Sequence, residues 1–342
     1  MCGIAGIKRM GVDSTPIGYD QITQLLMGIE HRGIDATGIC LQRQDGKLSW
    51  IKKDEAAWQF VSSGKTKKFI EENLTDEVMT CILHTRAWTC GPPTNQANNH
   101  PLTVGKVAVV HNGMIGNHHA LFSQTKLKRA GDVDSDIIRA ILDEYGLTPE
   151  GAKQLNALNG SAAIAAISSE QPDHLLLGRS GNPLVIAALG EPNWLMWASE
   201  KDAIHAASRA WLRKWNQWFR DNSSGAMFNP VEQEKLMLWT SEGVQWESSF
   251  STYGGQRRQV VYRNYDNKPD KDKRKQEEAN RKNLVQIEAQ RLPEMQLEEK
   301  PVRMKCRNLT CGLLLKFRPH HEKIPMYKLE CPKCGTRLGD QA

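Results

Sequence analysis

The residue best suited to chemistry in this chain of 342 residues is Cys2, which becomes terminal once the initiator methionine is removed. A terminal cysteine carries a nucleophilic thiol and a free α-amine on one residue. The reference pKa values of these two groups are about 8.5 and about 8, so the amine can accept the thiol proton near neutral pH. This pairing predicts nucleophilic catalysis. The small apolar run at 3–7 predicts a buried strand that holds the terminus.

Chemically useful side chains recur in short motifs downstream of this cysteine. The motifs are HRGIDATG at 31–38, HTRAWTCG at 84–91, NNHPL at 98–102, HNGMIGN at 111–117 and DSD at 134–136. Two of them directly follow apolar runs, 78–84 and 107–110, that predict strands. A rigid sheet positions side chains at its strand ends accurately, as a catalytic site requires.

The rest of the first 250 residues predicts alternating strands and helices. We expect a helix at 21–29, a hairpin around Asp45-Gly46, a helix at 137–142, strands at 161–167, 175–177 and 183–187, and a helix at 201–207. Asp134 and Ser135 are suitable caps for the second helix. Further on, Trp211, Trp215 and Trp218 have helical spacing, followed by Trp239 and Trp246. This predicts a helix that docks an aromatic face on the domain, with a partner surface as the alternative.

Taken in order, Cys2 and these motifs resemble the class II glutamine amidotransferases, most closely the glutaminase domain of glucosamine-6-phosphate synthase. Later segments at 158–167, 178–186 and 197–204 resemble the same family, so the resemblance covers residues 2 to about 210. It implies an α+β fold, the four-layer αββα sandwich of the N-terminal nucleophile hydrolases. It also implies an enzyme that hydrolyses L-glutamine to glutamate and ammonia through a Cys2 thioester, without a cofactor.

The resemblance assigns roles to individual side chains. The Asn112 side chain and the Gly113 N–H match the donors of the oxyanion hole. Arg86 matches the arginine that binds the substrate carboxylate, a task for which a guanidinium fork is well suited. Asp134 matches the aspartate that binds the substrate amine, and His100 matches a residue that lines the pocket near the nucleophile. Taken singly, each of these residues has an ordinary structural explanation, such as an ion pair or a helix cap.

Other motif residues receive supporting or structural roles. Arg32 and Asp35 are expected to support the site from behind, whereas His84, His118 and His119 are interpreted as structural. Two positions depart from the family pattern: Asp136 replaces a glutamate, and Cys90 replaces the residue before the glycine of the HTR motif. Neither change removes a catalytic role. Cys90 as an alternative nucleophile lacks an obvious activating group.

Composition indicates a globular protein: 39% of the residues are hydrophobic and 25% are charged. No apolar run approaches the ~18 residues of a membrane helix. The N-terminus also lacks the basic and apolar segments of a secretory signal. We therefore expect a cytoplasmic protein that does not enter membranes.

The last part of the chain contains a second candidate site. Its four cysteines form two close pairs: Cys306, Cys311, Cys331 and Cys334. This spacing predicts a tetrahedral structural zinc site in a small zinc-ribbon-like module, with a β-hairpin in the intervening residues 312–330. Disulfides or unpaired thiols are the alternatives. His320 and His321 lie between the pairs and are able to replace one ligand.

Charge and composition predict three parts: an amidotransferase domain at 2–255 with a Trp-rich extension from about 211, a charged linker at 256–302, and the four-cysteine module at 303–342. Residues 301–342 carry nine Lys and Arg against three Asp and Glu, so nucleic acid is a candidate partner of this tail. We expect a separate ammonia-accepting synthase as the main partner. Two alternatives stay open: an inactive scaffold whose zinc ribbon binds protein or nucleic acid, and an N-terminal cysteine hydrolase of another amide.

Overall fold

The computed structural model describes residues 1–190, 192–209, 228–252, 263–264, 302–305 and 314–317. The chain divides into two compact units, Met1–Asn267 and Lys268–Ala342. The boundaries at 255 and 302 that composition predicts remain a prediction. In the described part of the chain, no helix is long and apolar enough to cross a membrane.

Two antiparallel sheets form the centre of the first unit. The seven-stranded sheet has the order β10-β8-β9-β1-β4-β2-β3, and the six-stranded sheet has the order β13-β12-β11-β7-β6-β5. The strands of the first sheet are β1 (Gly3–Arg9), β2 (Ala36–Arg43), β3 (Leu48–Lys53), β4 (Val78–Arg86), β8 (Val185–Leu189), β9 (Trp194–Ala198) and β10 (Phe228–Pro230). Those of the second are β5 (Val107–Ile115), β6 (Gly160–Ser168), β7 (Gln171–Ser180), β11 (Lys235–Thr240), β12 (Gly243–Ser249) and β13 (Arg263–Asn264).

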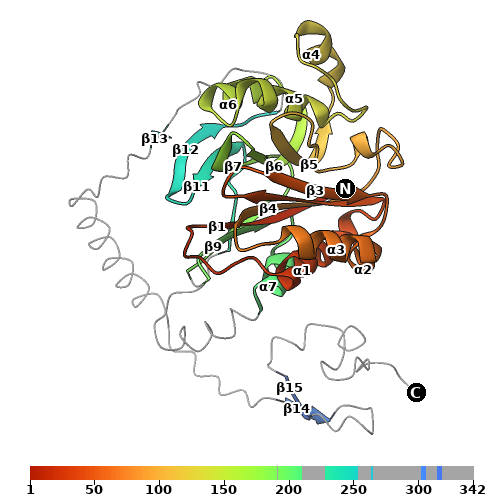
Figure 1. The fold of residues 1–342 in the computed structure, drawn as a ribbon, viewed down its shortest axis with the longest axis vertical. Helices are drawn as coiled ribbons and strands as arrows, with labels where there is room; N and C mark the ends of the chain where they lie inside the picture. Colours follow the sequence, from red (N-terminus) through yellow and green to blue (C-terminus); the bar gives the residue numbers. More distant parts are fainter. Residues whose placement is uncertain (191, 210–227, 253–262, 265–301, 306–313, 318–342) are drawn as a thin grey trace, which may run out of the picture. The chain divides into compact units, whose positions relative to one another are not determined.

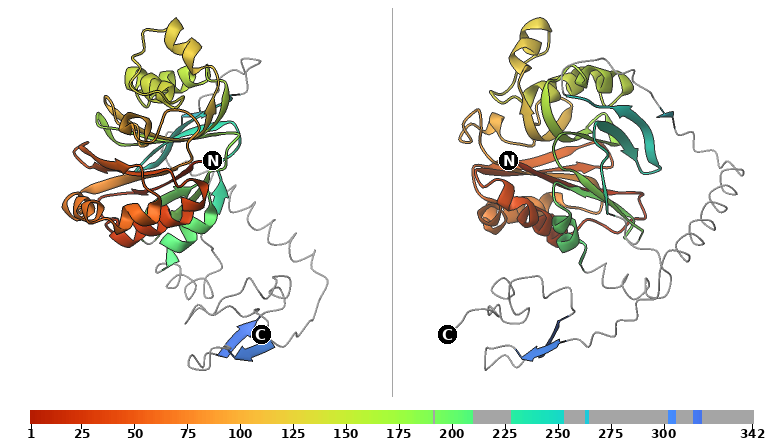
Figure 2. Two further views of the ribbon diagram at one scale, coloured as in Figure 1. Left: turned by 90° about the vertical axis from the view of Figure 1, so that its right-hand side faces the viewer. Right: turned by 180° about the vertical axis from the view of Figure 1, so that it is seen from behind.

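Helices cover the outer face of each sheet (Figures 1 and 2). The α-helices are α1 (Tyr19–Ile29), α2 (Ala57–Ser62), α3 (Gly64–Asn73), α4 (His118–Gln124), α5 (Asp136–Tyr145), α6 (Pro149–Leu155) and α7 (Lys201–Ala207), and short 3-10 turns lie at Glu30–Arg32 and Gln96–Asn98. Helices α1, α2, α3 and α7 share one apolar core with the first sheet, and α5 and α6 share another with the second. A third core fills the space between the sheets. These layers confirm the predicted four-layer α+β sandwich.

Strand β1 lies inside the first sheet and not at its edge. Every residue from Gly3 to Arg9 is buried, and the strand pairs with β4 on one side and β9 on the other. Its start is fixed by Ser199, whose hydroxyl accepts from Ile4 N–H at 3.1 Å and whose own N–H donates to the Ile4 carbonyl at 2.8 Å. The terminus is therefore held by residues from distant parts of the chain.

Most of the predicted elements are present, with two differences. The strand expected at 107–110 continues through the HNG motif to Ile115, because residues Val107–Ile115 all pair with β6. Trp239 and Trp246 lie on strands β11 and β12 and do not extend the helix that the tryptophan spacing predicts. The tryptophans that carry that spacing, Trp211, Trp215 and Trp218, lie outside the described residues.

In the second unit, strands β14 (Val302–Lys305) and β15 (Leu314–Phe317) form an antiparallel pair in which Val302 is opposite Phe317. Cys306 and Cys311 fall between these strands in the sequence. They lie outside the described residues, as do Cys331 and Cys334. The zinc site therefore stays a prediction, and the hairpin uses one strand that precedes the expected span of 312–330.

Candidate active site

Cys2 lies at the entrance to strand β1, where pairing of Gly3 with Thr85 brings it beside the end of β4. The Cys2 thiol, which is partly buried, donates to the Ala87 carbonyl with an Sγ–O distance of 3.7 Å. Arg32 donates from Nε to the Cys2 carbonyl at 2.9 Å and also forms an ion pair with Glu200. The predicted support by Arg32 thus consists of a direct hydrogen bond to the backbone of the nucleophile.

Burial raises the pKa of the Cys2 thiol above its ordinary value. The hydrogen bond to Ala87, the N-terminal ammonium and the Arg86 guanidinium all act in the opposite direction, and the Asp134 carboxylate adds to the rise. The thiol therefore needs a proton acceptor before it can attack. The hydrogen bond to Ala87 places Cys2 at the start of the loop that follows Arg86, and Cys90 of the same loop contacts Asp134.

Arg86 is buried at the end of β4, and its guanidinium forms hydrogen bonds with the Asn99 side chain and with the backbone of the loop that follows the strand. It donates to Asn99 Oδ1 at 2.7 Å and to the backbone carbonyls of Cys90 and Gly91 at 2.6 and 2.5 Å. Burial lowers the pKa of Arg86, while nearby acidic groups, among them Asp134, raise it. Because arginine titrates far above neutral pH, the guanidinium stays charged. The hydrogen bonds that this buried cation makes to described residues all go to neutral oxygens.

The HRGID motif fastens the loop that follows Arg86. Asp35 N–H donates to the Arg86 carbonyl at 2.9 Å, and its carboxylate accepts from Trp88 N–H at 2.7 Å. Gly33 is required by close approach, since a Cβ there would lie 2.2 Å from the Arg86 carbonyl carbon. The predicted supporting role of Asp35 is therefore to position the loop at 87–91.

Asp134 lies just before helix α5 and faces the same loop. One of its carboxylate oxygens accepts from Ile115 N–H at 2.6 Å, and the other lies 3.8 Å from the Cys90 thiol, which donates to it. The Cys90 thiol is therefore engaged as a donor to Asp134. Asp134 is oriented by strand β5 and keeps one oxygen toward the loop.

Asn112 and Gly113 lie on strand β5, beyond the end at residue 110 that the sequence pattern predicts. Asn112 is 1% exposed, and its Nδ2 has no hydrogen-bond partner among the described residues. Gly113 has a φ of +153°, and a Cβ there would lie 1.9 Å from the Ser161 carbonyl oxygen. An unoccupied buried donor is what an oxyanion hole offers before substrate binds. Strand β5 contacts β1 across the space between the sheets.

His100 belongs to a buried polar cluster behind these groups. Its ring stacks on His84 with 4.2 Å between ring centroids, and neither ring nitrogen has a hydrogen-bond partner in the described part of the chain. Lys52 donates to the carbonyls of Asn99 and Pro101 at 2.8 and 3.0 Å. Burial lowers the pKa of His84 to about 3 and that of Lys52 to about 8, and it also lowers that of His100.

The structure thus brings Cys2, Arg86 and Asp134 together and places Asn112 and Gly113 on a strand that contacts β1, while His100 lies among buried histidines. Sequence reasoning missed Lys52, Glu200, Ser161 and Asn182, all of which bond to these residues or their neighbours. Within the described ranges, no group of three or more His, Cys, Asp or Glu side chains is arranged to hold a metal ion.

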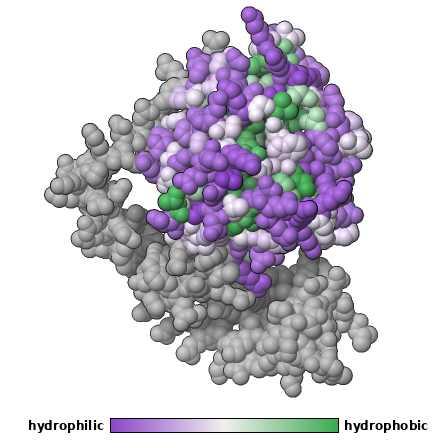
Figure 3. Space-filling view, in the orientation of Figure 1, coloured by the Kyte–Doolittle hydropathy of each residue, from purple (hydrophilic) through white to green (hydrophobic). Residues whose placement is uncertain are grey.

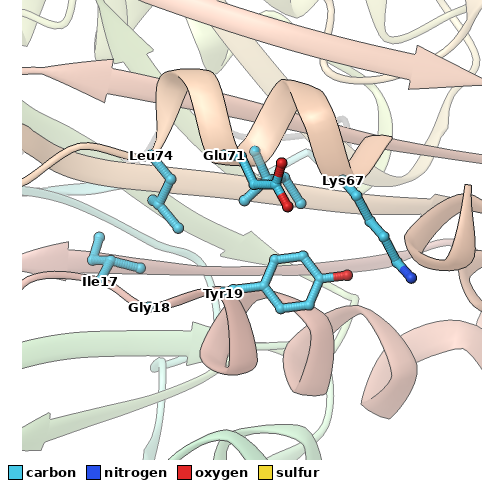
Figure 4. Close-up of a pocket in the computed structure, with 7 residues that line it drawn as sticks. Ile17, Gly18, Tyr19, Lys67, Glu71 and Leu74 are labelled. Carbon is cyan, nitrogen blue, oxygen red and sulfur yellow. The ribbon is translucent and has the colours of Figure 1, made fainter. Parts of the chain in front are cut away.

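A separate hollow of about 540 Å³ lies between helices α1 and α3 (Figure 4). Tyr19 lies across it, with Lys67 and Glu71 on the α3 side, and the other lining residues are Ile17, Gly18, Ile70 and Leu74. No residue predicted for the active site lines it.

Comparison with known proteins finds a matching family and several relatives. A family model described as a glutamine amidotransferase domain matches residues 84–206. The isomerizing glutamine–fructose-6-phosphate aminotransferase of Pseudomonas syringae pv. tomato is 30% identical over 262 residues, which cover 71% of this chain and 38% of the relative. The Caulobacter vibrioides protein of the same name is 35% identical over 201 residues, covering 54% of this chain and 30% of the relative. The chain thus spans about a third of the length of these curated relatives.

Solved structures show the same fold. The glutamine phosphoribosylpyrophosphate amidotransferase of B. subtilis, complexed with ADP and GMP, has a TM-score of 0.52 at 20% identity and covers 73% of this chain and 49% of its own. A structure titled as the allosteric regulatory enzyme of purine biosynthesis has a TM-score of 0.51, also at 20% identity, and covers 71% and 48%. Together with the ordered motifs, the comparisons show that this chain carries a class II glutamine amidotransferase domain with the N-terminal nucleophile hydrolase fold.

Proposed function

We propose that the chain hydrolyses L-glutamine to glutamate and ammonia once Met1 has been removed. The observation that carries the proposal is the contact of the Cys2 thiol with the carbonyl of Ala87, the residue after Arg86, at the start of the loop whose Cys90 contacts Asp134. A free amino acid is a zwitterion, so its carboxylate requires a cation and its ammonium an anion. A nucleophile set beside one buried cation and one carboxylate suits such a substrate better than an uncharged amide.

In the proposed reaction, the α-amine of Cys2 accepts the thiol proton, and the thiolate attacks the side-chain amide carbon. The Asn112 side chain and Gly113 N–H stabilise the oxyanion of the tetrahedral intermediate. The amine returns the proton to the leaving nitrogen, the C–N bond breaks, and ammonia departs. Water then attacks the Cys2 thioester and releases glutamate.

Removal of Met1 is required because the α-nitrogen of Cys2 is otherwise an amide and cannot accept a proton. Met1 is 76% exposed, so an aminopeptidase can reach it. The test is intact-mass analysis after labelling with an electrophilic glutamine analogue. We expect a chain without Met1 that carries a single adduct on Cys2. An active preparation that retains Met1 would overturn the mechanism.

Ammonia is proposed to pass to a separate acceptor enzyme. The surface next to the site supports this, because Ile34, Trp88 and Met114 are 63%, 55% and 60% exposed. Ile34 precedes Asp35, whose carboxylate accepts from Trp88 N–H, and Met114 follows the predicted oxyanion donor Gly113. On the face seen in Figure 3, apolar side chains reach the surface as small patches among hydrophilic ones. An acceptor that covers these residues would keep ammonia away from bulk water.

The acceptor is tested by titrating candidate enzymes from the genomic neighbourhood into a glutaminase assay. We expect one candidate to bind and change the rate, and we expect Trp88→Ala to weaken that binding. Trp58→Ala is the matched control, since Trp58 has the same 55% exposure on helix α2. If no candidate binds or changes the rate, the transfer proposal fails while glutamine hydrolysis stands.

We further propose that Cys306, Cys311, Cys331 and Cys334 bind a structural zinc ion. The pairing of β14 with β15 supports this, because the first cysteine pair falls between two paired strands in the sequence. Metal analysis of the full chain should find one zinc ion, lost in Cys331→Ser. A zinc-free chain with two disulfides by mass would favour the alternative. The comparisons add nothing in favour of nucleic-acid binding by the basic tail.

The competing function is that of an inactive scaffold. A scaffold has no need for a buried Asn112 donor without a partner among the described residues, or for a Cys2 thiol held at the start of the loop after Arg86. Absence of glutaminase activity in a chain shown to lack Met1, alone and with candidate partners, would favour the scaffold.

A further inference from the structure

Asn182 is attached to the backbone of the predicted oxyanion donor. It lies in the connection between β7 and β8, and its Nδ2 donates to the Asn112 backbone carbonyl at 3.1 Å and to Ser161 Oγ at 3.0 Å. Seventy positions separate it from Asn112 in the sequence. One side-chain amide thus ties this loop to both β5 and β6.

The hydrogen bond to the Asn112 carbonyl matters because Asn112 and Gly113 can stabilise an oxyanion only if their N–H groups point toward it. The Asn112 amide has no partner of its own among the described residues, so the direction of its N–H groups depends on how its backbone is held. The Gly113 N–H follows the Asn112 carbonyl in the same peptide unit. A bond to that carbonyl therefore fixes the peptide plane that presents the second donor.

The backbone of this segment also pairs with β6, where Asn112 is opposite Ala163, and other side chains hold the residues around it. His111 bonds through Nδ1 to Ser135 Oγ at 2.7 Å and through Nε2 to the Ser161 carbonyl at 3.3 Å. Asp134 accepts from Ile115 N–H. The only described side chain that hydrogen-bonds the Asn112 carbonyl is Asn182.

We propose that Asn182 is a positioning residue for the oxyanion hole: by holding the Asn112–Gly113 peptide, it sets the direction of both donors. This role rests on the proposed glutamine hydrolysis. In the described part of the chain, Asn182 makes no hydrogen bond to Cys2, Arg86 or Asp134. It therefore acts on the tetrahedral intermediate and not on the binding of the amino-acid zwitterion.

A purely structural role would consist of fastening the β7–β8 loop to the sheet. Asn156 provides a matched control for this structural role. It too is partly buried, and its Nδ2 donates to two acceptors, the Ala152 and Ser249 carbonyls, at 3.2 and 3.1 Å. It holds a helix end and a strand remote from the motifs of the site, so Asn156→Ala measures the cost of losing a comparable fastening.

The experiment compares Asn182→Asp, Asn182→Ala and Asn156→Ala in the full chain without Met1. The aspartate keeps the size of the side chain but lacks both N–H donors and places a carboxylate oxygen near the Asn112 carbonyl. We expect kcat to fall by about 10- to 100-fold in the Asn182 variants, because small misplacements of catalytic groups have effects of that size. KM for glutamine should change by less than about 3-fold, since the zwitterion-binding groups are untouched. Asn156→Ala should retain the wild-type kcat.

A second readout isolates the oxyanion hole. The γ-aldehyde of glutamate adds the Cys2 thiol and forms a tetrahedral thiohemiacetal, whereas product glutamate binds without forming one. Affinity for the aldehyde should fall by the same factor as kcat, and affinity for glutamate should stay unchanged. Ser161→Ala removes one of the two acceptors of Asn182 and should give a smaller loss of kcat.

Each outcome bears on a different statement. Unchanged kcat and aldehyde affinity in folded Asn182 variants would overturn the positioning role and leave glutamine hydrolysis intact. An equal loss in Asn156→Ala, or parallel losses of glutamate and aldehyde affinity, would show a structural effect only. A wild-type chain without Met1 that neither hydrolyses glutamine nor binds the aldehyde would overturn the proposed function itself.

Discussion

The candidate site has two walls, one from each sheet, and they differ in whether their polar side chains already have hydrogen-bond partners. The wall from the first sheet carries Cys2 and Arg86, and its polar groups already have partners: Arg86 bonds to Asn99 and two loop carbonyls, and the Cys2 carbonyl bonds to Arg32. The wall from the second sheet carries Asn112, whose buried Nδ2 has no partner among the described residues.

This difference separates two tasks. A buried charge is too costly to leave without hydrogen-bonding partners, so Arg86 must be satisfied before substrate arrives. A neutral amide is less costly to leave without a partner, and it gains most when the oxyanion forms. We infer that the first wall contributes to binding and the nucleophile, whereas the second contributes mainly to the transition state.

The largest expected effect is the loss of the nucleophile. Cys2→Ala should lower kcat by at least about 10⁴-fold, as removal of a nucleophile does in enzymes that form acyl intermediates. A steady-state ammonia-release assay measures this. Cys90→Ala should remain active, because the Cys90 thiol faces a carboxylate. Equal loss in both variants would contradict the assignment of Cys2 alone.

The second wall is tested by Asn112→Ala. Removing one oxyanion donor should lower kcat by about 10²- to 10³-fold with little change in KM. Gly113→Ala should be worse tolerated structurally, since its Cβ would collide with the Ser161 carbonyl. Thermal denaturation separates the two cases. An Asn112→Ala variant with a raised KM and an unchanged kcat would contradict the division between the walls.

The first wall is tested by Arg86→Lys, which keeps the charge but removes the fork. KM for glutamine should rise by about 10- to 100-fold, because hydrogen bonds to a charged group contribute about 1.5–3 kcal/mol. The fall in kcat should be smaller than in Asn112→Ala. Steady-state kinetics of Arg86→Lys and Asn112→Ala measure both parameters. If Arg86→Lys lowers only kcat, the two sheets do not divide binding from transition-state stabilisation.

The smallest effect concerns the buried histidines beside these groups. Burial lowers the pKa of His84 to about 3 in the folded chain, whereas an unfolded histidine titrates near about 6.5. Between these values the unfolded state binds the extra proton, so the free energy of unfolding falls as pH drops. The loss is about 1.4 kcal/mol per pH unit for this residue.

Thermal denaturation at pH 7 and pH 5 checks this stability effect. His84→Gln retains a donor for the His111 carbonyl and should show a smaller drop in Tm between the two pH values than the wild type. At pH 7 His84 is mainly neutral in both the folded and the unfolded state, so the Tm of each protein at pH 7 is the reference for its own Tm at pH 5. Identical pH dependence in the two proteins would contradict the prediction.

Local patterns were sufficient to predict the elements that lie near the motifs. The apolar faces of α1 and β4 and the turn at Asp45-Gly46 are encoded by neighbouring residues, and each appears as expected. The extension of β5 to Ile115 was not predictable, because HNG has no strand pattern and its pairing depends on β6. Helix α3 was missed as well, since only Thr66 and Ile70 are buried on it.

The residues of the candidate site fall into the same two groups, those found in local motifs and those that only the tertiary fold brings together. Motif order was enough to propose roles for Cys2, Arg86 and Asp134, because each lies in a short motif of neighbouring residues that resembles the family pattern. Glu200 and Asn182 were missed because their contacts span 168 and 70 positions, and nothing in their own neighbourhoods marks them. Such partners follow only from the tertiary fold.

The place of β1 inside the first sheet also has a consequence for synthesis. Its hydrogen-bonding partners are Val78–Arg86 on one side and Trp194–Ala198 on the other, and Ser199 fixes its start. During translation the second edge of β1 must wait until nearly two hundred residues have been made. The backbone that holds Cys2 is thus completed only by residues from far along the sequence.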